Sequence, residues 1–315
     1  MKHAAVWESS GVVAVTALFC CALWGSAFPA IKIGYAIWGI AAEAVGDQLL
    51  FAGYRFTLAG VLVLLLGSAA ERRLLIPRRG TWGRIGRLSL LQTVGQYVFF
   101  YIGLAHTSGV TGSIMVGTNS LITILVAALI FREEKLTAAK TLGCLAGLLG
   151  VVAANWGGRL GGFRWNGEGL ILASVVCYAF SSVLIKRYAQ DESPVLLSGW
   201  QFAMGGLMLV VIGLLCGGRP TAQGWSPAGI GMLLYLAFLS AVAYSLWGVL
   251  LRSNPVSRVA IYGFMNPVMG VILSAALLGE GTQAFRWQNL AALGLVSGGI
   301  LLVNWFPHRR KEERG

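Results

Sequence analysis

A single arginine, Arg55, interrupts the long apolar stretch 48–70. If this stretch is a helix that crosses a membrane, Arg55 lies about 10 Å from one end at about 1.5 Å per residue. A charge at that depth costs on the order of 3 kcal/mol or more. Its guanidinium could hold a carboxylate or a phosphate through two parallel hydrogen bonds. Alternatively, Arg55 bonds backbone carbonyls of the preceding loop or pairs with Glu43 or Asp47 there, and both interpretations stay open.

Polar and aromatic side chains recur in several other apolar stretches. Rings with a polar tip and adaptable methionines suit a pocket for a partly apolar metabolite. The alternative is that these groups only bond neighbouring helices to one another. We favour a substrate cavity, and its candidate residues are Trp24, Ser26, Arg55, Gln96, Tyr97, Tyr101, Met115, Asn119, Tyr178, Ser182, Gln201, Tyr244, Trp247, Tyr262 and Asn266.

Acids, histidines and cysteines are placed badly for catalysis or for metal binding. Every acid lies in a predicted loop or at a helix end, the three histidines are terminal or at a helix edge, and the five cysteines lack ligand spacing. A phosphate-binding G-x-x-x-x-G-K-[ST] motif is absent. We therefore expect no enzyme, no metal and no cofactor. Glu134 and Glu280 are the nearest candidates for proton carriers, and helix-end charges are the alternative.

The composition is that of a polytopic membrane protein. Hydrophobic residues make up 57% of the 315 residues and charged residues only 11%, against about a quarter charged in a soluble domain. Stretches of about 20 apolar residues predict membrane-spanning helices. Ten are expected, at 12–35, 48–70, 86–106, 109–131, 137–156, 168–189, 194–216, 227–251, 256–278 and 284–306. The net charge of +12 does not indicate a nucleic-acid partner, because the arginines lie in short loops between apolar stretches.

The distribution of basic residues predicts the orientation. With the N-terminus inside, 18 of the 24 lysines and arginines fall on the inner side. This bias predicts that both termini are cytoplasmic in a multi-pass protein of the cytoplasmic (inner) membrane. The first apolar stretch lacks a clear cleavage site and is expected to be a retained helix.

The chain repeats itself. One aligned pair of segments is Trp24–Lys32 (WGSAFPAIK) and Tyr178–Lys186 (YAFSSVLIK). Further along each half, YRF at 54–56 aligns with WQF at 200–202. The predicted domains are two five-helix repeats, 12–156 and 168–306. An odd number of helices turns the second repeat upside down, which is an architecture of secondary transporters.

The stretch Trp24–Lys32 also contains Gly25, Ser26 and Pro29. Proline within a helix frees a carbonyl and bends the axis. We expect a broken helix that lines a path, with a kinked packing helix as the alternative. Lys32 is interpreted as an anchor at the membrane interface.

These features together resemble the EamA family of the drug/metabolite transporter superfamily. The resemblance lies in the ten-helix plan, the W-G-S-x-F-x-x-x-K run, the Arg-Phe pair at 55–56, the acids that close helices four and nine, and the glycine-rich helices five and ten. It implies transport of small metabolites, often amino acids or related compounds, across the cytoplasmic membrane. The chain departs from the repeat pattern at Gln201, which stands opposite Arg55, and in a longer first outer loop at 36–47.

We therefore expect a secondary transporter that moves a small metabolite by alternating access, with export as the favoured direction. An intramembrane enzyme and a non-transporting membrane scaffold are the rivals. The expected partners are the small-molecule substrate and the lipid bilayer. Small residues four apart in 143–150 and 294–299 predict close helix contacts, within the chain or in a homodimer.

Overall fold

The computed structural model describes residues 6–132, 135–154, 163–254, 259 and 261–312, which contain helices, turns and loops but no strand. The first half holds α2 (Ser10–Trp38), α3 (Val45–Glu71), α4 (Trp82–Leu88), α5 (Gln96–Ala105), α6 (Gly109–Gly117), α7 (Asn119–Leu125) and α8 (Ala138–Ala154). The second half holds α9 (Leu170–Tyr188), α10 (Pro194–Leu215), α11 (Pro227–Ser253), α13 (Met265–Leu277), the short α14 (Gly281–Ala284) and α15 (Trp287–Glu312). Segments 89–95, 126–130 and 165–169 have π-helical hydrogen bonding and extend α4, α7 and α9 without a gap.

Seven helical stretches among the described residues are long and apolar enough to cross a membrane, and three further apolar helices are shorter. The shorter ones are Ala138–Gly150, Met265–Leu277 and Trp287–Leu302. The prediction of an all-helical, polytopic membrane protein is confirmed. The count of ten spans stays a prediction, because three of the ten fall on these shorter helices.

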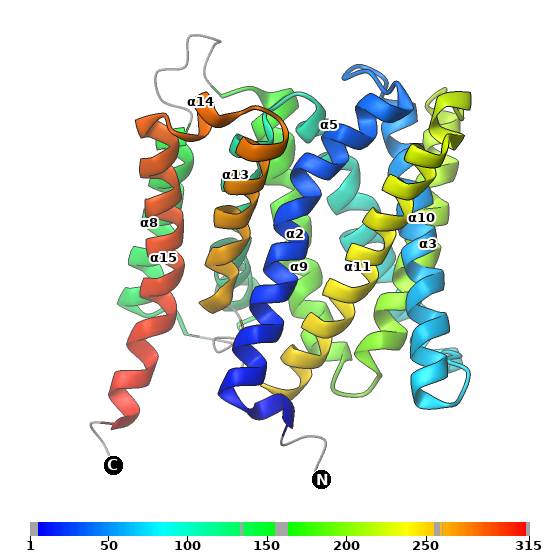
Figure 1. Cartoon of the computed structure of the whole chain (residues 1–315). Coiled ribbons are helices and arrows are strands. Elements are labelled where there is room, and N and C mark those ends of the chain that lie inside the picture. The colour runs from blue at the N-terminus through cyan, green and yellow to red at the C-terminus, as the bar shows by residue number, and fades with distance from the viewer. Residues whose placement is uncertain (1–5, 133–134, 155–162, 255–258, 260, 313–315) are drawn as a thin grey trace.

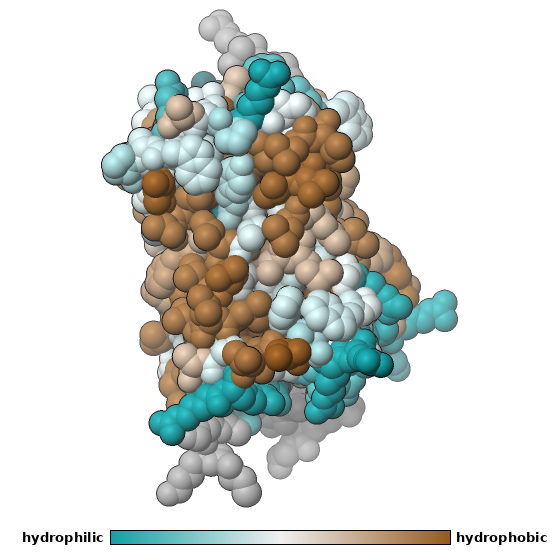
Figure 2. Space-filling model, turned by 90° about the vertical axis from the view of Figure 1, so that its right-hand side faces the viewer, coloured by the Kyte–Doolittle hydropathy of each residue, from teal (hydrophilic) through white to brown (hydrophobic). Residues whose placement is uncertain are grey.

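The helices run up and down through one slab (Figure 1). Helices α8 and α15 stand at one side, α3 and α10 at the other, and α2, α5, α9, α11 and α13 lie between them. Helix α2 begins and α15 ends at the same, lower face. On the face turned toward the viewer in Figure 2, hydrophobic side chains form a broad middle zone, with the most hydrophilic ones at its upper and lower rims. That distribution matches a bilayer with an apolar interior and polar surfaces.

Local sequence signals explain where two of the helices, α6 and α11, begin. Ser108 precedes α6 and its hydroxyl accepts a hydrogen bond from the amide of Thr111 at 3.0 Å. Ser226 precedes α11 and accepts one from the amide of Gly229 at 3.2 Å, with Pro227 in the first helical position. Serine at the cap and proline at the first position satisfy or remove amides that a helix leaves unpaired at its start.

Glycines seven residues apart hold α3 and α10 together. Gly46, Gly53 and Gly60 lie on α3, and Gly199, Gly206 and Gly213 lie on α10. A β-carbon at Gly53 would lie 2.7 Å from the Val210 amide nitrogen, and one at Gly213 would lie 2.8 Å from that of Leu50. The two backbones therefore touch, in the manner of small residues in membrane helix pairs.

The second glycine-rich pair is α8 and α15. A β-carbon at Gly299 would lie 2.6 Å from the Gly143 carbonyl oxygen, so the predicted close contact forms within the chain here. Gly294 and Gly298 have open space in front of them. The predicted homodimer stays a prediction.

Helix α2 corrects one expectation. It runs unbroken from Ser10 to Trp38 through Gly25, Ser26 and Pro29. Helix α2 packs against α11 and α13, and membrane helices tolerate an internal proline where neighbouring helices support the backbone. The interruptions occur elsewhere, at Thr118 between α6 and α7, and at 261–264, where a 3-10 turn leads into α13.

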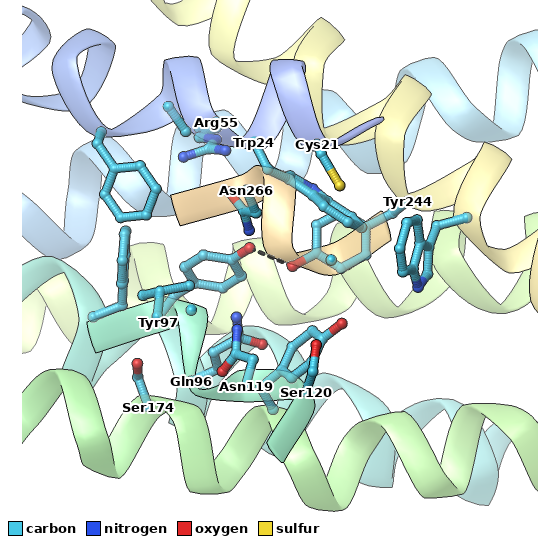
Figure 3. Close-up of a pocket in the computed structure, with 18 residues that line it drawn as sticks. Cys21, Trp24, Arg55, Gln96, Tyr97, Asn119, Ser120, Ser174, Tyr244 and Asn266 are labelled. Atoms are coloured by element: carbon cyan, nitrogen blue, oxygen red, sulfur yellow. Dashed lines mark hydrogen bonds between the residues drawn. The ribbon is translucent and has the colours of Figure 1, made fainter. Parts of the chain in front are cut away.

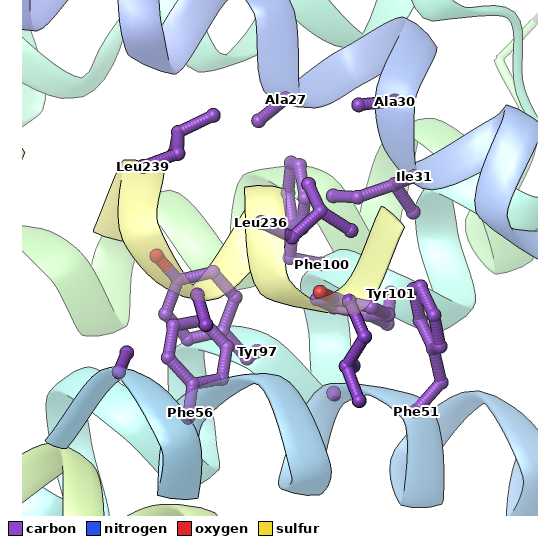
Figure 4. Close-up of a cluster of buried hydrophobic side chains, with 14 of the residues drawn as sticks. Ala27, Ala30, Ile31, Phe51, Phe56, Tyr97, Phe100, Tyr101, Leu236 and Leu239 are labelled. Atoms are coloured by element: carbon purple, nitrogen blue, oxygen red, sulfur yellow. The ribbon is translucent and has the colours of Figure 1, made fainter. Parts of the chain in front are cut away.

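An aromatic core fills the space between α2, α3, α5 and α11 (Figure 4). Phe51 and Phe56 come from α3, and Tyr97, Phe100 and Tyr101 come from α5. All five side chains are buried. Because such a core is close-packed, it holds the side chains at its edge in fixed positions.

Candidate functional site

A cavity lies at the centre of the bundle (Figure 3). Its volume of about 90 Å³ is enough for several water molecules. The lining comes from α2, α3, α5, α6, α7, α9, α11, the turn 261–264 and α13, and none of it from the described parts of α8, α10 and α15. The lining residues are Cys21, Trp24, Ala27, Phe28, Arg55, Gln96, Tyr97, Phe100, Val116, Gly117, Asn119, Ser120, Ser174, Tyr178, Tyr244, Trp247, Gly263 and Asn266.

Aromatic rings form one wall. The Trp24 ring meets Tyr244 and Trp247 edge-on, with centroids 5.3 and 5.0 Å apart. The hydroxyls of Tyr97 and Tyr244 share a hydrogen bond of 2.6 Å across the space between α5 and α11 (Figure 3). Phe28 and Phe100 extend the wall, with ring centroids 5.9 Å apart. This wall offers an apolar surface with hydroxyl tips, which suits the apolar part of a solute.

Arg55 supplies a buried positive charge at the edge of the cavity, with 2% of its surface exposed. Its Nε donates to the Leu236 carbonyl at 3.2 Å and to Ser240 Oγ at 3.1 Å. One terminal nitrogen donates to Tyr101 Oη at 2.8 Å, and the other to Ser240 Oγ at 2.8 Å. The guanidinium also lies 4.8 Å from the centre of the Phe56 ring, within reach of a cation–π contact.

This arrangement leaves the arginine incompletely satisfied. A guanidinium has five N–H donors, and those bonds engage three of them. One N–H on each terminal nitrogen has no hydrogen-bond partner in the described part of the chain. No carboxylate of those residues lies within ion-pair distance of Arg55 either. A buried cation without an anionic partner is costly, so an anionic group entering the cavity would be held strongly.

The alternative interpretation, in which Arg55 bonds the backbone carbonyls or acids of the preceding loop, is wrong. Its backbone partner is Leu236 on α11 and not a residue of 39–44. Asp47 accepts a hydrogen bond from the Arg219 amide at 2.8 Å.

Four further polar atoms around the cavity are buried and have no hydrogen-bond partner in the described part of the chain. They are Trp24 Nε1, Gln96 Oε1, Asn119 Oδ1 and Asn266 Oδ1. Buried polar groups are almost always paired, and each unpaired one costs about 1–3 kcal/mol. Four of them around one cavity indicate that solvent or a solute completes their hydrogen bonds.

Asn119 and Asn266 owe their positions to the interruptions in their helices. Asn119 directly follows the break at Thr118, and Asn266 follows the turn 261–264. Irregular backbone at membrane depth occurs where it is buried in protein or lines a cavity. The two breaks turn amide side chains toward the same space from opposite halves of the sequence.

The structure brings nine of the fifteen predicted site residues together at the cavity, namely Trp24, Arg55, Gln96, Tyr97, Asn119, Tyr178, Tyr244, Trp247 and Asn266.

Six predicted residues are absent from the lining. Ser26 bonds the Tyr235 hydroxyl at 2.6 Å in an exposed contact, and Gln201 bonds Thr93 at 2.8 Å between α10 and the segment 89–95. Tyr101 is fully buried behind Arg55 and orients it. Met115 packs with Ile171, Tyr262 packs with α2 and α11 residues, and Ser182 lies one helical turn beyond Tyr178. Tyr101 and Ser182 share a helix face with Tyr97 and Tyr178 but lie one turn further along, outside the lining. Ser26 is two residues from both Trp24 and Phe28 and lies on another face of α2.

Sequence reasoning missed several lining residues. They include Phe28 and Phe100, whose sequence context is that of ordinary core residues. They also include Cys21 and Ser174, which are isolated small side chains in apolar helices. Their helical spacing was the available signal: Cys21, Trp24 and Phe28 follow one another at intervals of three and four, and so do Ser174 and Tyr178.

The cavity has few groups for catalysis. Its lining residues include no carboxylate and no histidine, so no general base of those types faces Cys21, Ser120 or Ser174. Within the described part of the chain, no three His, Cys, Asp or Glu side chains are grouped as metal ligands.

Comparison with known proteins fits this geometry. The EamA-like transporter family matches residues 11–156 and 165–305, which together make up most of the chain. The chain belongs to the EamA-like transporter family. This protein is therefore, like the family, a multi-pass membrane protein of the transporter class.

Two proteins similar to this EamA-like protein are transporters by name. It is 28% identical to the uncharacterized inner membrane transporter YedA of Escherichia coli, over 89% of this chain and 87% of YedA. It is 25% identical to the uncharacterized transporter YyaM of Bacillus subtilis, over 78% of this chain and 81% of YyaM. One solved crystal structure superimposes with a TM-score of 0.67 at 20% identity, covering 96% of this chain and 99% of that one, which shows a shared fold.

Proposed function

We propose that this EamA-like protein is a secondary transporter that moves a small metabolite across the cytoplasmic membrane by alternating access. The substrate is an amino acid or a related compound that carries an anionic group, and the direction is export. Family membership and the relatives' names support transport in general. The substrate class, direction and mechanism are the proposal.

The observation that carries the proposal is Arg55 at the edge of a central cavity. Its charge lacks an anionic partner among the described residues, and two of its N–H groups are unengaged. A carboxylate or phosphate offers two oxygens that match two neighbouring N–H donors. The aromatic wall and the four unpartnered polar atoms would then contact the remainder of the solute.

The arrangement of the helices supports alternating access between two inverted repeats. The cavity is lined by residues 21–120 from one half and 174–266 from the other. Helices in equal positions of the two predicted repeats pack against each other, as α3 does with α10, α6 with α13, and α8 with α15. A site between two such halves could be exposed to one side of the membrane at a time as the halves rock.

The test is a transport screen in proteoliposomes. Purified protein is reconstituted, and the uptake and efflux of radiolabelled amino acids and related carboxylates and phosphates are measured against protein-free vesicles. We expect at least one anionic or zwitterionic solute to move, with transport saturating as its concentration rises. If no solute in a broad screen moves while the protein stays folded, the transport proposal is wrong.

Arg55→Met and Arg55→Lys test the anchor. Losing a hydrogen bond to a charged group costs about 1.5–3 kcal/mol, so we expect Arg55→Met to weaken the apparent substrate affinity by about 10- to 100-fold. Arg55→Lys keeps the positive charge but lacks the planar pair of N–H donors of a guanidinium. Its apparent substrate affinity should therefore lie between those of the unmodified protein and Arg55→Met. Arg219→Gln is the control, because Arg219 is exposed and its backbone amide alone bonds Asp47. Unchanged affinity in folded Arg55→Met would exclude the anchor role.

A further inference from the structure

The segment between α3 and α4, residues 72–79, presents apolar and basic side chains together at the lower face. Leu74 and Ile76 are 76% and 66% exposed, whereas Leu75 between them is 4% exposed. The exposed pair is flanked by Arg72 on one side and by Arg78 and Arg79 on the other, all three exposed. Hydrophilic and hydrophobic side chains also lie side by side along the lower rim in Figure 2.

The segment is held in a defined position. The Leu75 side chain packs in a buried cluster with Ile85, Leu88, Leu196 and Leu197. Its amide donates to Ser68 Oγ at 3.1 Å, and its carbonyl accepts from Trp200 Nε1 at 2.7 Å. Because Leu75 is fixed on both backbone sides, its two neighbours are kept pointing outward.

Acids close to this segment are already engaged. Glu71 pairs with Arg73 at 2.6 Å, Asp191 pairs with Arg84 at 3.0 Å, and Glu192 accepts a hydrogen bond from Thr81. Arg72, Arg78 and Arg79 have no carboxylate within ion-pair distance among the described residues. Three guanidinium groups without a carboxylate partner in the described part of the chain therefore flank two exposed aliphatic side chains in the sequence.

We propose that residues 72–79 form a binding site for anionic phospholipid headgroups of the adjacent leaflet. The guanidinium groups contact the lipid phosphates, and Leu74 and Ile76 insert beside the acyl chains. Arginine is suited to phosphate because its fork matches two oxygens. Each basic residue near an anionic membrane surface contributes about 1 kcal/mol of attraction, which is about a fivefold change in binding. The proposal does not depend on what the cavity transports.

Native mass spectrometry of the detergent-purified protein tests the site. Phosphatidylglycerol and phosphatidylcholine with identical acyl chains are titrated, and the dissociation constant of each is measured. The variant Arg78→Gln/Arg79→Gln is expected to bind phosphatidylglycerol roughly 25-fold more weakly, at about fivefold per arginine, with phosphatidylcholine unchanged. The matched control is Arg219→Gln/Arg286→Gln, which removes two exposed arginines elsewhere in the chain.

Two further measurements guard against a folding artefact. For the unmodified protein, raising the salt concentration should weaken phosphatidylglycerol binding by screening the charges, and should leave phosphatidylcholine binding unaffected. Leu74→Ser/Ile76→Ser should weaken binding of both lipids, because it removes the inserted side chains. The proposal is overturned if the two lipids bind the unmodified protein equally, or if the Arg78/Arg79 variant behaves like its control.

Discussion

Ser240 offers a sharp test of how the cavity arginine is positioned. Its hydroxyl oxygen accepts hydrogen bonds from Arg55 Nε at 3.1 Å and from a terminal nitrogen at 2.8 Å, and it donates to the Leu236 carbonyl at 3.1 Å. Ser240→Ala removes this oxygen and retains the β-carbon. The guanidinium then keeps its bonds to Leu236 and Tyr101 but loses the contact that fixes its far nitrogen.

The size of the effect follows from these contacts. Arg55 Nε still has the Leu236 carbonyl as a partner, so the net loss is the single bond from the terminal nitrogen. A hydrogen bond to a charged group contributes about 1.5–3 kcal/mol. The free and the substrate-bound protein both lose this bond, so its energy appears mainly as reduced stability. Substrate binding weakens because the guanidinium is no longer held in one orientation, and ordering a mobile side chain on binding costs about 0.5–1.5 kcal/mol. We therefore expect KM to rise by up to about tenfold, since about 1.4 kcal/mol corresponds to a factor of ten.

The assay is the KM for uptake of the solute identified in the proteoliposome screen, measured together with thermal unfolding. Ser113→Ala is the matched control, because Ser113 is a fully buried helical serine whose hydroxyl donates to the Val110 carbonyl at 2.8 Å and does not contact Arg55. Equal KM values for the two variants would refute the idea that Ser240 orients the arginine. Reduced stability of Ser240→Ala with an unchanged KM would assign it a purely structural role.

Two predictions concern stability. At Gly206, an added β-carbon would lie 2.6 Å from Thr57 Oγ1 and 2.8 Å from the Phe56 carbonyl carbon, so we expect Gly206→Ala to destabilise the protein by about 1–3 kcal/mol. Gly231→Ala on α11 is the control, since a β-carbon added at Gly231 would have no neighbour within 4 Å and alanine favours a helix. Equal unfolding temperatures for Gly206→Ala and Gly231→Ala would disprove the tight α3–α10 contact. Glu280 accepts from the Gly109 and Val110 amides at 3.2 and 2.9 Å, so Glu280→Gln should cost about 1 kcal/mol through the lost charge at the start of α6. Exposed Glu43→Gln is the comparison, and an equally small shift in both unfolding temperatures would show that the Glu280 contact adds nothing.

Sequence reasoning found most of the polar cavity because polar groups in apolar helices are conspicuous. Arg55, Asn119 and Asn266 stand out in long hydrophobic runs, where each is costly unless it faces protein or a cavity. The same reasoning overestimated Pro29, since neighbouring helices support an unbroken α2. It also passed over the seven-residue glycine spacing of α3 and α10, although that pattern is visible in the sequence.

Composition and the lengths of the apolar stretches by themselves determined that this protein is a helical membrane protein, because a chain with 57% hydrophobic and only 11% charged residues cannot cover its surface with charge. Motif order indicated the family. Only the tertiary structure decided which face of each helix meets the cavity. In the structure, Tyr101 and Ser240 accept hydrogen bonds from Arg55. Gln201 accepts a hydrogen bond from Thr93, away from the cavity, and Ser26 shares an exposed hydrogen bond with Tyr235. The physical reason is that lipid and protein interior are both apolar, so hydrophobic pattern alone cannot distinguish a lipid-facing side from a cavity-facing one.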